Sequence, residues 1–434
     1  MPIRLTTDTP DFERAFAAFL DAKRAEEEDV DAAVAGILAD VRTRGDVALV
    51  ELTARFDRLE LTPESLKLKE EDLAAAADAC PHETVEALEA AAERIEAFHR
   101  RLLPQDLRYR DAAGVELGAR WTPLGSAGLY VPGGLAAYPS SVLMNALPAR
   151  VAGVDRIVMV SPTPDGTVNP AVMAAARIAG VREVYRIGGA QAVAALAYGT
   201  ATIQPVDKIV GPGNAYVAAA KRRVFGTVGI DLIAGPSEIL VVADGENDPD
   251  WIAVDLLSQA EHDASAQSVL ITDDPAFADA VEAAIERQLA TLERADIAGA
   301  SWREHGAVII VPSLEAAVPL VDRIAPEHLE LAVADPEPLA DAVRNAGAVF
   351  LGRFTPEAVG DYVAGPNHVL PTARSARFSS GLGVLDFMKR TSIVACDADS
   401  LGRIGGAALS LARAEGLGAH AKSIAVRLNR PPDG

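Results

Sequence analysis

The feature that most constrains this chain is a regular alternation of short apolar runs and helical stretches from about residue 120 onwards. The apolar runs are rich in Val and Ile, and the stretches between them are rich in Ala and often end on glycine. Parallel strands need a helical crossover of this length, so the alternation predicts parallel sheets with right-handed connections. The expected strands are 156–162, 183–187, 206–210, 239–243, 268–272, 307–311, 329–333 and 348–352, and the helices include 169–180, 190–198 and 214–225.

A Gly-Pro-Ser-Glu corner at 235–238 interrupts this alternation, which then resumes. We therefore predict an α/β protein with two doubly wound domains. Before residue 110, Phe12, Phe16 and Phe19 recur at helical spacing and indicate a helical N-terminal region. After residue 379, Gly-rich turns and a helix containing HAKSIAVRL predict an extended C-terminal tail.

Charge and cysteine content exclude several classes of protein. The formal net charge is −22, which argues against nucleic acid or an anionic membrane as the main partner. The two cysteines, Cys80 and Cys396, form no CxxC pair and support neither a disulfide framework nor a thiolate zinc site. The N-terminus lacks the pattern of a signal peptide, and prolines and glycines break the uncharged run 131–149. We expect a soluble cytoplasmic protein.

Glycine turns follow three of the predicted strands. They read Val131-Pro-Gly-Gly, Ile187-Gly-Gly-Ala-Gln and Val210-Gly-Pro-Gly-Asn, while GxGxxG and GxxxxGK[ST] are absent. Glycine allows a ligand to approach the backbone, and a following helix N-terminus favours phosphate. Each turn alone also fits simple strand-to-helix punctuation, but three in one α/β unit predict a dinucleotide site of a non-standard kind.

A helix starting after Asp248 carries a candidate ligand pair near its end. Asp248 can cap this helix, Pro249 fits its first position, and Gln259 and His262 lie three residues apart. That spacing brings side chains to neighbouring positions, so an amide oxygen and an imidazole can meet one cation. A polar helix end with an ordinary surface histidine is the alternative.

Three further polar clusters lie beside turns. Glu327 and His328 are adjacent, and they can share one pocket only if the chain turns there. Asp361 falls at the end of a short helix, with His368 in the loop that follows, and Glu415 and His420 flank a Gly-rich turn. Each also fits a capping or surface role. Together they indicate a metal site with nitrogen and oxygen ligands and no thiolate.

Longer stretches give the chain an end-to-end resemblance to the histidinol dehydrogenase family. These stretches are GLYVPGGLAAYPSSVLMNALPA, IVGPGNAYVAAAK, IDLIAGPSEIL, DLLSQAEHD, PEHLEL, GPNHVLPT and EGLGAHAKS. The resemblance implies incomplete Rossmann-like domains similar to those of aldehyde dehydrogenases. It also implies a Zn²⁺ site, substrate contacts, an acid–base pair and NAD contacts. The implied residues are Gln259, His262, Asp361 and His420 for zinc; Ser237, His368 and Glu415, with His328 and the zinc ligands, for substrate; Glu327 and His328 for acid–base chemistry; and Tyr130, Gln191 and Asn214 for NAD.

The resemblance also implies a homodimer in which the C-terminal tail, with Glu415 and His420, reaches the neighbouring subunit's site. We expect four segments: a helical segment 1–25, an α/β domain of 26–130 plus 237–378 with the metal and acid–base residues, an NAD domain 131–236, and the tail 379–434.

The implied activity is a four-electron oxidation of L-histidinol to L-histidine through the aldehyde, with two NAD⁺. We expect His328 to take the hydroxyl proton and Glu327 to activate water for the aldehyde hydrate. The alternatives are a related metal-dependent dehydrogenase of another polar alcohol, a thiol route through cysteine, and a non-catalytic protein that keeps the fold. The metal loaded in the cell, zinc or manganese for example, and a role for His305 stay open.

Overall fold

We describe the protein from a computed structural model, which covers residues 2–22, 30–133, 138–233 and 235–430. The chain forms two compact units. The first comprises residues 1–102 and 125–387, and the second comprises residues 103–124 and 388–434. None of the described helices is long and apolar enough to cross a membrane.

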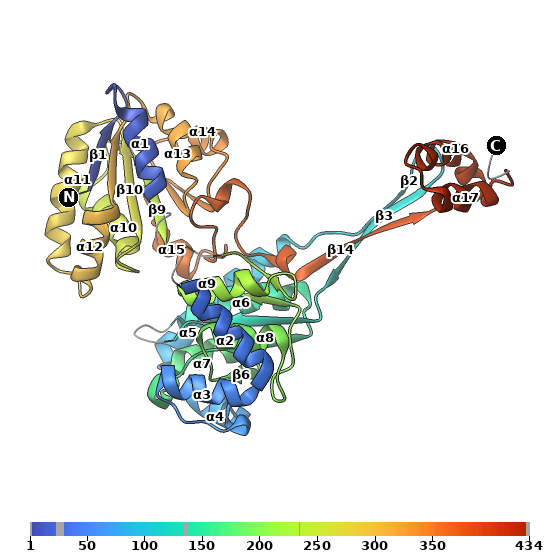
Figure 1. Cartoon of the computed structure of the whole chain (residues 1–434). Coiled ribbons are helices and arrows are strands. Elements are labelled where there is room, and N and C mark those ends of the chain that lie inside the picture. The colour runs from blue at the N-terminus through green and yellow to red at the C-terminus, as the bar shows by residue number, and fades with distance from the viewer. Residues whose placement is uncertain (1, 23–29, 134–137, 234, 431–434) are drawn as a thin grey trace. The chain divides into compact units, whose positions relative to one another are not determined.

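The first unit contains a wholly parallel sheet of six strands in the order β1-β11-β10-β9-β12-β13. Figure 1 labels β1, β10 and β9 of this sheet. Its strands are β1 (Ile3–Thr6), β9 (Glu238–Ala243), β10 (Gln267–Thr272), β11 (Ala307–Ile310), β12 (His328–Ala332) and β13 (Ala348–Leu351). Alternate residues of β9 face opposite sides, with Val241 in one apolar core and Val242 in the other. Helices α10 (Pro249–Ala260), α11 (Pro275–Leu289) and α12 (Ala295–His305) cover the first side, and α1 (Phe12–Asp21), α13 (Val318–Ile324) and α14 (Glu337–Ala342) cover the second.

A second parallel sheet in the same unit has the order β6-β5-β4-β7-β8. Its strands are β4 (Ser126–Tyr130), β5 (Arg156–Val160), β6 (Glu183–Tyr185), β7 (Lys208–Val210) and β8 (Gly229–Ile230). One core contains α2 (Val30–Arg44), α3 (Asp46–Asp57), α8 (Gly189–Tyr198) and α9 (Ala215–Val224). A second helical group consists of α4 (Glu70–Asp78), α5 (His82–Arg101), α6 (Pro139–Ala152) and α7 (Pro170–Ala179), of which α6 contacts β4 and β5. The predicted doubly wound α/β class is confirmed.

The helices before residue 102 pack differently from our assignment. We grouped residues 26–130 with 237–378, but α2 places Val34, Leu38 and Val41 in the core of the five-stranded sheet. The physical reason is that an apolar helix face specifies burial without specifying which of two sheets will bury it. The N-terminal segment also differs, because β1 adds a strand to the edge of the six-stranded sheet ahead of α1.

The second unit is an antiparallel three-stranded sheet followed by two helices. Its strand order is β14-β3-β2, with β14 (Met388–Ala395), β3 (Glu116–Pro123) and β2 (Leu107–Arg110). The helices are α16 (Ala398–Ala414) and α17 (Gly418–Arg427). We expected glycine-rich turns where α16 lies. A capping box between Asp397 and Ser400 starts this helix and offsets the cost of its glycines.

His99 on α5 gives the first unit a pH-dependent stability. Its residue is 1% exposed, and neither ring nitrogen has a hydrogen-bond partner among the described residues. Burial lowers the pKa of His99 to about 4 from 6.5. Between these pH values the unfolded chain binds a proton that the folded chain does not, so stability falls as the pH falls. We expect a loss of about 3 kcal/mol from this histidine between pH 6.5 and 4, at ~1.4 kcal/mol per unit.

Denaturant unfolding across this pH range, compared with His99→Phe, measures the effect. The variant keeps an aromatic ring beside Phe98 but cannot be protonated. Its free energy of unfolding should fall less steeply below pH 6.5. Equal slopes in both proteins would contradict the assignment.

Candidate active site

The predicted acid–base pair, Glu327 and His328, lies where β12 begins, and the backbone of a neighbouring strand holds both side chains. Glu238, the first residue of β9, donates its backbone N–H to Glu327 Oε2 at 2.9 Å. Its carbonyl oxygen lies 3.0 Å from His328 Nδ1. A carbonyl only accepts, so Nδ1 carries the proton and Nε2 is the basic nitrogen of the neutral ring. Both side chains therefore contact the backbone of the same residue. The chain bends at Glu327, just before β12, as we expected for two adjacent residues that lie at one site.

Both members of the pair have shifted pKa values. Burial raises the pKa of Glu327 to about 7. Burial lowers the pKa of His328, but the negative charges of Glu327, Asp361 and Glu357 outweigh that effect and raise it to about 10. His328 Nε2 lies 3.6 Å from Glu357 Oε1 and 3.6 Å from Asp361 Oδ1. These buried carboxylates therefore stabilise a positive charge placed among them.

A short helix, α15 (Glu357–Tyr362), presents two of these acids one turn apart. Its start is fixed by buried Glu330 of β12, whose Oε1 accepts the Glu357 N–H at 2.5 Å. Burial raises the pKa of Glu357 to about 8 and that of Glu330 well above its usual value. Sequence reasoning named Asp361 but missed Glu357. The four-residue spacing on one helix is the signal that could have found it.

The candidate metal ligands from α10 lie close together. Gln259 is fully buried, and its Nε2 lies 3.5 Å from His262 Nδ1. The side chain of His262 is exposed. The protein atoms around its ring nevertheless displace water and lower its pKa, which favours the neutral form that binds metal ions. Separately, one ligand atom each from His328, Glu357 and Asp361 lie within 4.8 Å of one another.

A cation fits these residues on physical grounds. Gln259 Oε1, Glu357 Oε1 and His328 Nε2 are buried, and none has a hydrogen-bond partner among the described residues. Buried polar atoms without partners are rare in proteins and need an explanation. The oxygen and nitrogen donors are those that divalent transition metals accept.

A cavity of about 400 Å³ opens beside the acid–base pair. His328, Asp361 and His368 line one part of it, and Phe98 and His99 of α5 line another. Substrate-sized ligands bind in concave sites of this volume with a few convergent polar groups.

Of the predicted substrate contacts in the first unit, His368 lines this cavity, and Ser237 lies next to Glu238 in the chain. His368 Nδ1 lies 2.9 Å from the Asp361 carbonyl oxygen, and Nε2 lies 3.3 Å from Ser141 Oγ. Ser237 directly precedes Glu238 and is partly exposed. Glu415 and His420 belong to the second unit, where both are exposed, Glu415 at the end of α16 and His420 on α17.

The three predicted cofactor contacts lie at the carboxyl edge of the five-stranded sheet. Tyr130 ends β4, and its hydroxyl accepts the Gly189 N–H at 3.0 Å. Gln191 lies in the first turn of α8 and is 2% exposed. Asn214 caps α9 through its side-chain oxygen, which accepts the N–H groups of Tyr216 and Val217. The last residue of the first glycine turn, Gly134, lies outside the described residues.

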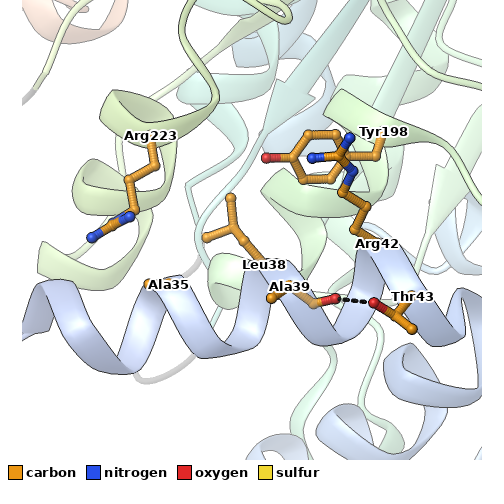
Figure 2. Close-up of a pocket in the computed structure, with 7 residues that line it drawn as sticks. All are labelled: Ala35, Leu38, Ala39, Arg42, Thr43, Tyr198 and Arg223. Atoms are coloured by element: carbon orange, nitrogen blue, oxygen red, sulfur yellow. Dashed lines mark hydrogen bonds between the residues drawn. The ribbon is translucent and has the colours of Figure 1, made fainter.

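A second cavity, of about 270 Å³, lies between α2 and the ends of α8 and α9 (Figure 2). The Arg42 guanidinium stacks over the Tyr198 ring at 5.4 Å, and Arg223 pairs with Asp31. Ala35, Leu38, Ala39 and Thr43 complete the lining. Among the described residues, its lining contains neither a histidine nor a carboxylate, whereas three of the predicted site residues, His328, Asp361 and His368, line the first cavity.

Comparisons with known proteins agree with this geometry. A sequence model described as histidinol dehydrogenase matches residues 20–428. The histidinol dehydrogenase of Rhodospirillum rubrum is 66% identical over 99% of both chains, and that of Rhizobium meliloti is 66% identical over 100% of both. The crystal structure of histidinol dehydrogenase from Elizabethkingia anophelis aligns with a TM-score of 0.94 and 35% identity, covering 99% of this chain and 98% of that one.

The cap on α15 can be tested by changing Glu330. Glu330→Leu leaves the buried Glu357 N–H without an acceptor and should cost about 1–3 kcal/mol of unfolding free energy. Glu330→Gln keeps an acceptor and resembles the protonated acid, so we expect a loss below about 1 kcal/mol. Denaturant unfolding of both variants measures the difference. A glutamine variant as unstable as the leucine variant would contradict the capping role.

Proposed function

This chain belongs to the histidinol dehydrogenase family and oxidises L-histidinol in histidine biosynthesis, and we propose that it does so with two NAD⁺ and a divalent metal ion. In this scheme, L-histidinol, one water and two NAD⁺ yield L-histidine, two NADH and three protons. The observation that carries the proposal is the buried pair Glu327–His328 beside candidate ligand atoms that have no hydrogen-bond partner within the described part of the chain.

The proposed metal ligands are Gln259, His262 and Asp361, together with His420 of a second copy of this chain. We favour Gln259 and His262 over His328 as ligands because Glu238 orients His328 so that Nε2 is available for proton transfer. Zinc suits this set of two imidazoles and two oxygen ligands. When bound, the ion holds the substrate's nitrogens as a template and offsets the negative charge that raises the pKa of His328.

His328 is the proposed base for both oxidations. Its Nε2 accepts the hydroxyl proton of histidinol while the carbon-bound hydrogen leaves as hydride to NAD⁺, which forms the aldehyde. Glu327, with its pKa raised to about 7, takes a proton from water as the water adds to the aldehyde. Protonated His328 gives its proton to the aldehyde oxygen in the same step, which forms the hydrate and restores the neutral imidazole. His328 then accepts a hydroxyl proton of the resulting hydrate as the second hydride leaves. Each of these proton transfers contributes about 10²–10⁴-fold to the rate.

In this proposal, residues of two copies of the chain bind the substrate. Ser237 and His368 supply contacts from this chain, and Glu415 of the second copy accepts a hydrogen bond from the imidazole or amine. Exposure of both Glu415 and His420 on the separate second unit supports a homodimer with shared sites.

The proposed cofactor site is formed by Tyr130, Gln191 and Asn214. The first turns of α8 and α9 supply backbone N–H groups at the carboxyl edge of the sheet, where phosphates bind in α/β folds. We place the enzyme in the cytoplasm, which agrees with two free cysteines, one of them exposed.

Counting products tests the proposal. The purified dimer should carry about one divalent ion per chain by elemental analysis, and should form two NADH per histidinol consumed. Removal of the ion by a chelator should abolish turnover, and adding Zn²⁺ or Mn²⁺ should restore it. One NADH per histidinol, with free aldehyde released, would contradict the four-electron scheme.

Separate assays of the two half-reactions test the roles within the acid–base pair. Glu327→Gln removes the carboxylate that activates water, so aldehyde oxidation should slow by about 10²–10⁴-fold. Alcohol oxidation should slow much less, because His328 serves that step. Unchanged metal content in the variant is the control. Equal losses in both half-reactions would show that this division of roles is wrong.

A further inference from the structure

The turn between β7 and α9 packs directly against the end of β4. Gly211 has a φ of +114°, and a Cβ atom there would lie 2.1 Å from the Tyr130 carbonyl oxygen. Only glycine fits this position, and the backbone of a glycine is more flexible than that of any other residue. The turn between β7 and α9 therefore starts at a flexible residue, and other contacts must fix its conformation.

A buried ion pair holds both polar groups of that residue. Lys221 of α9 and Asp231, which follows β8, have side chains that are each 2% exposed and pair with each other. The Gly211 N–H donates to Asp231 Oδ2 at 2.7 Å. Lys221 Nζ donates to the Gly211 carbonyl oxygen at 2.9 Å. The two charged groups thus fix the peptide planes on either side of Gly211.

Stability alone does not explain such a pair. The desolvation cost of two buried charges often exceeds their attraction, and well-packed apolar residues can replace them without loss. Apolar residues could not bind the amide and the carbonyl of Gly211 at the same time. The geometry therefore favours a role in orientation.

We propose that the Lys221–Asp231 pair positions the dinucleotide cofactor by fixing Gly211, and with it Asn214 and the first turn of α9. The inference rests on the proposed use of NAD⁺ at this edge of the sheet. Neither charged group touches the cofactor in this scheme. They act through the turn, and their loss should weaken cofactor binding more than it slows hydride transfer.

The same strand offers a matched control pair at its other end. Lys208 begins β7, and its Nζ lies 2.8 Å from Asp386 Oδ1. The side chains of this pair are 13% and 30% exposed. Lys208 lies at the amino edge of the sheet, away from the glycine turns. Removing this pair changes charge and stability without touching Gly211.

The experiment compares Lys221→Met/Asp231→Asn with Lys208→Met/Asp386→Asn in the metal-loaded, full-length enzyme. Each double variant removes both charges, so neither leaves an unpaired buried ion. In the first, we expect the KM for NAD⁺ and the Kd for NADH to rise about 10- to 100-fold, while kcat changes less than about threefold. The control pair should leave both cofactor constants within about twofold of wild type, and the KM for histidinol should stay unchanged in both.

Unchanged cofactor constants in the first variant, or equal changes in both variants, would overturn the proposal. If the first variant does not fold, Lys221→Met alone replaces it, because it removes the donor to the Gly211 carbonyl oxygen while Asp231 still accepts the Gly211 N–H. That single variant should still raise the Kd for NADH, and wild-type binding would again refute the role. A wild-type enzyme that fails to bind NADH would instead refute the proposed function.

Discussion

The two backbone groups of Glu238 are the contacts on which the site depends. Its N–H binds Glu327 and its carbonyl binds His328, so one residue of β9 sets the positions of both acid–base groups. The parallel register of β9 and β12, in which His328 lies opposite Ile239, brings these atoms together. A register shift by one residue would turn His328 to the other face of the sheet. Strand pairing, which is more rigid than a loop, thus fixes the positions of these two side chains.

The predicted site residues lie at the carboxyl edge of one sheet and at the amino edge of the other. Tyr130 and the glycine turns lie at the carboxyl edge of the five-stranded sheet, as expected for a doubly wound fold. Glu327, His328 and Glu238 lie where their strands begin, at the amino edge of the six-stranded sheet. The glycine turns therefore lie at the edge where α/β sheets generally bind ligands, and the buried acids do not.

The sequence predicted the parts of this structure that depend on local pattern. Strand and helix alternation predicted both parallel sheets, and the spacing of Gln259 and His262 predicted their contact at 3.5 Å. Pattern could not assign α2 to a sheet, nor pair β1 with β11, because those choices depend on contacts between distant segments. Glu330 was missed for the same reason, whereas Glu357 was missed although its four-residue spacing from Asp361 is a local signal. Each resembles a surface acid until the fold buries it.

The position of β1 at the edge of the six-stranded sheet has a consequence for synthesis on the ribosome. Ile3 pairs with Ala307, so the first strand waits for roughly 300 further residues before its partner emerges, about 15–60 s at about 5–20 residues per second. The five-stranded sheet is complete by Ile230 and can fold during that delay. The nascent chain therefore carries an unpaired N-terminal strand beside a finished sheet, and a ribosome-associated chaperone has its longest opportunity to bind at Ile3–Thr6.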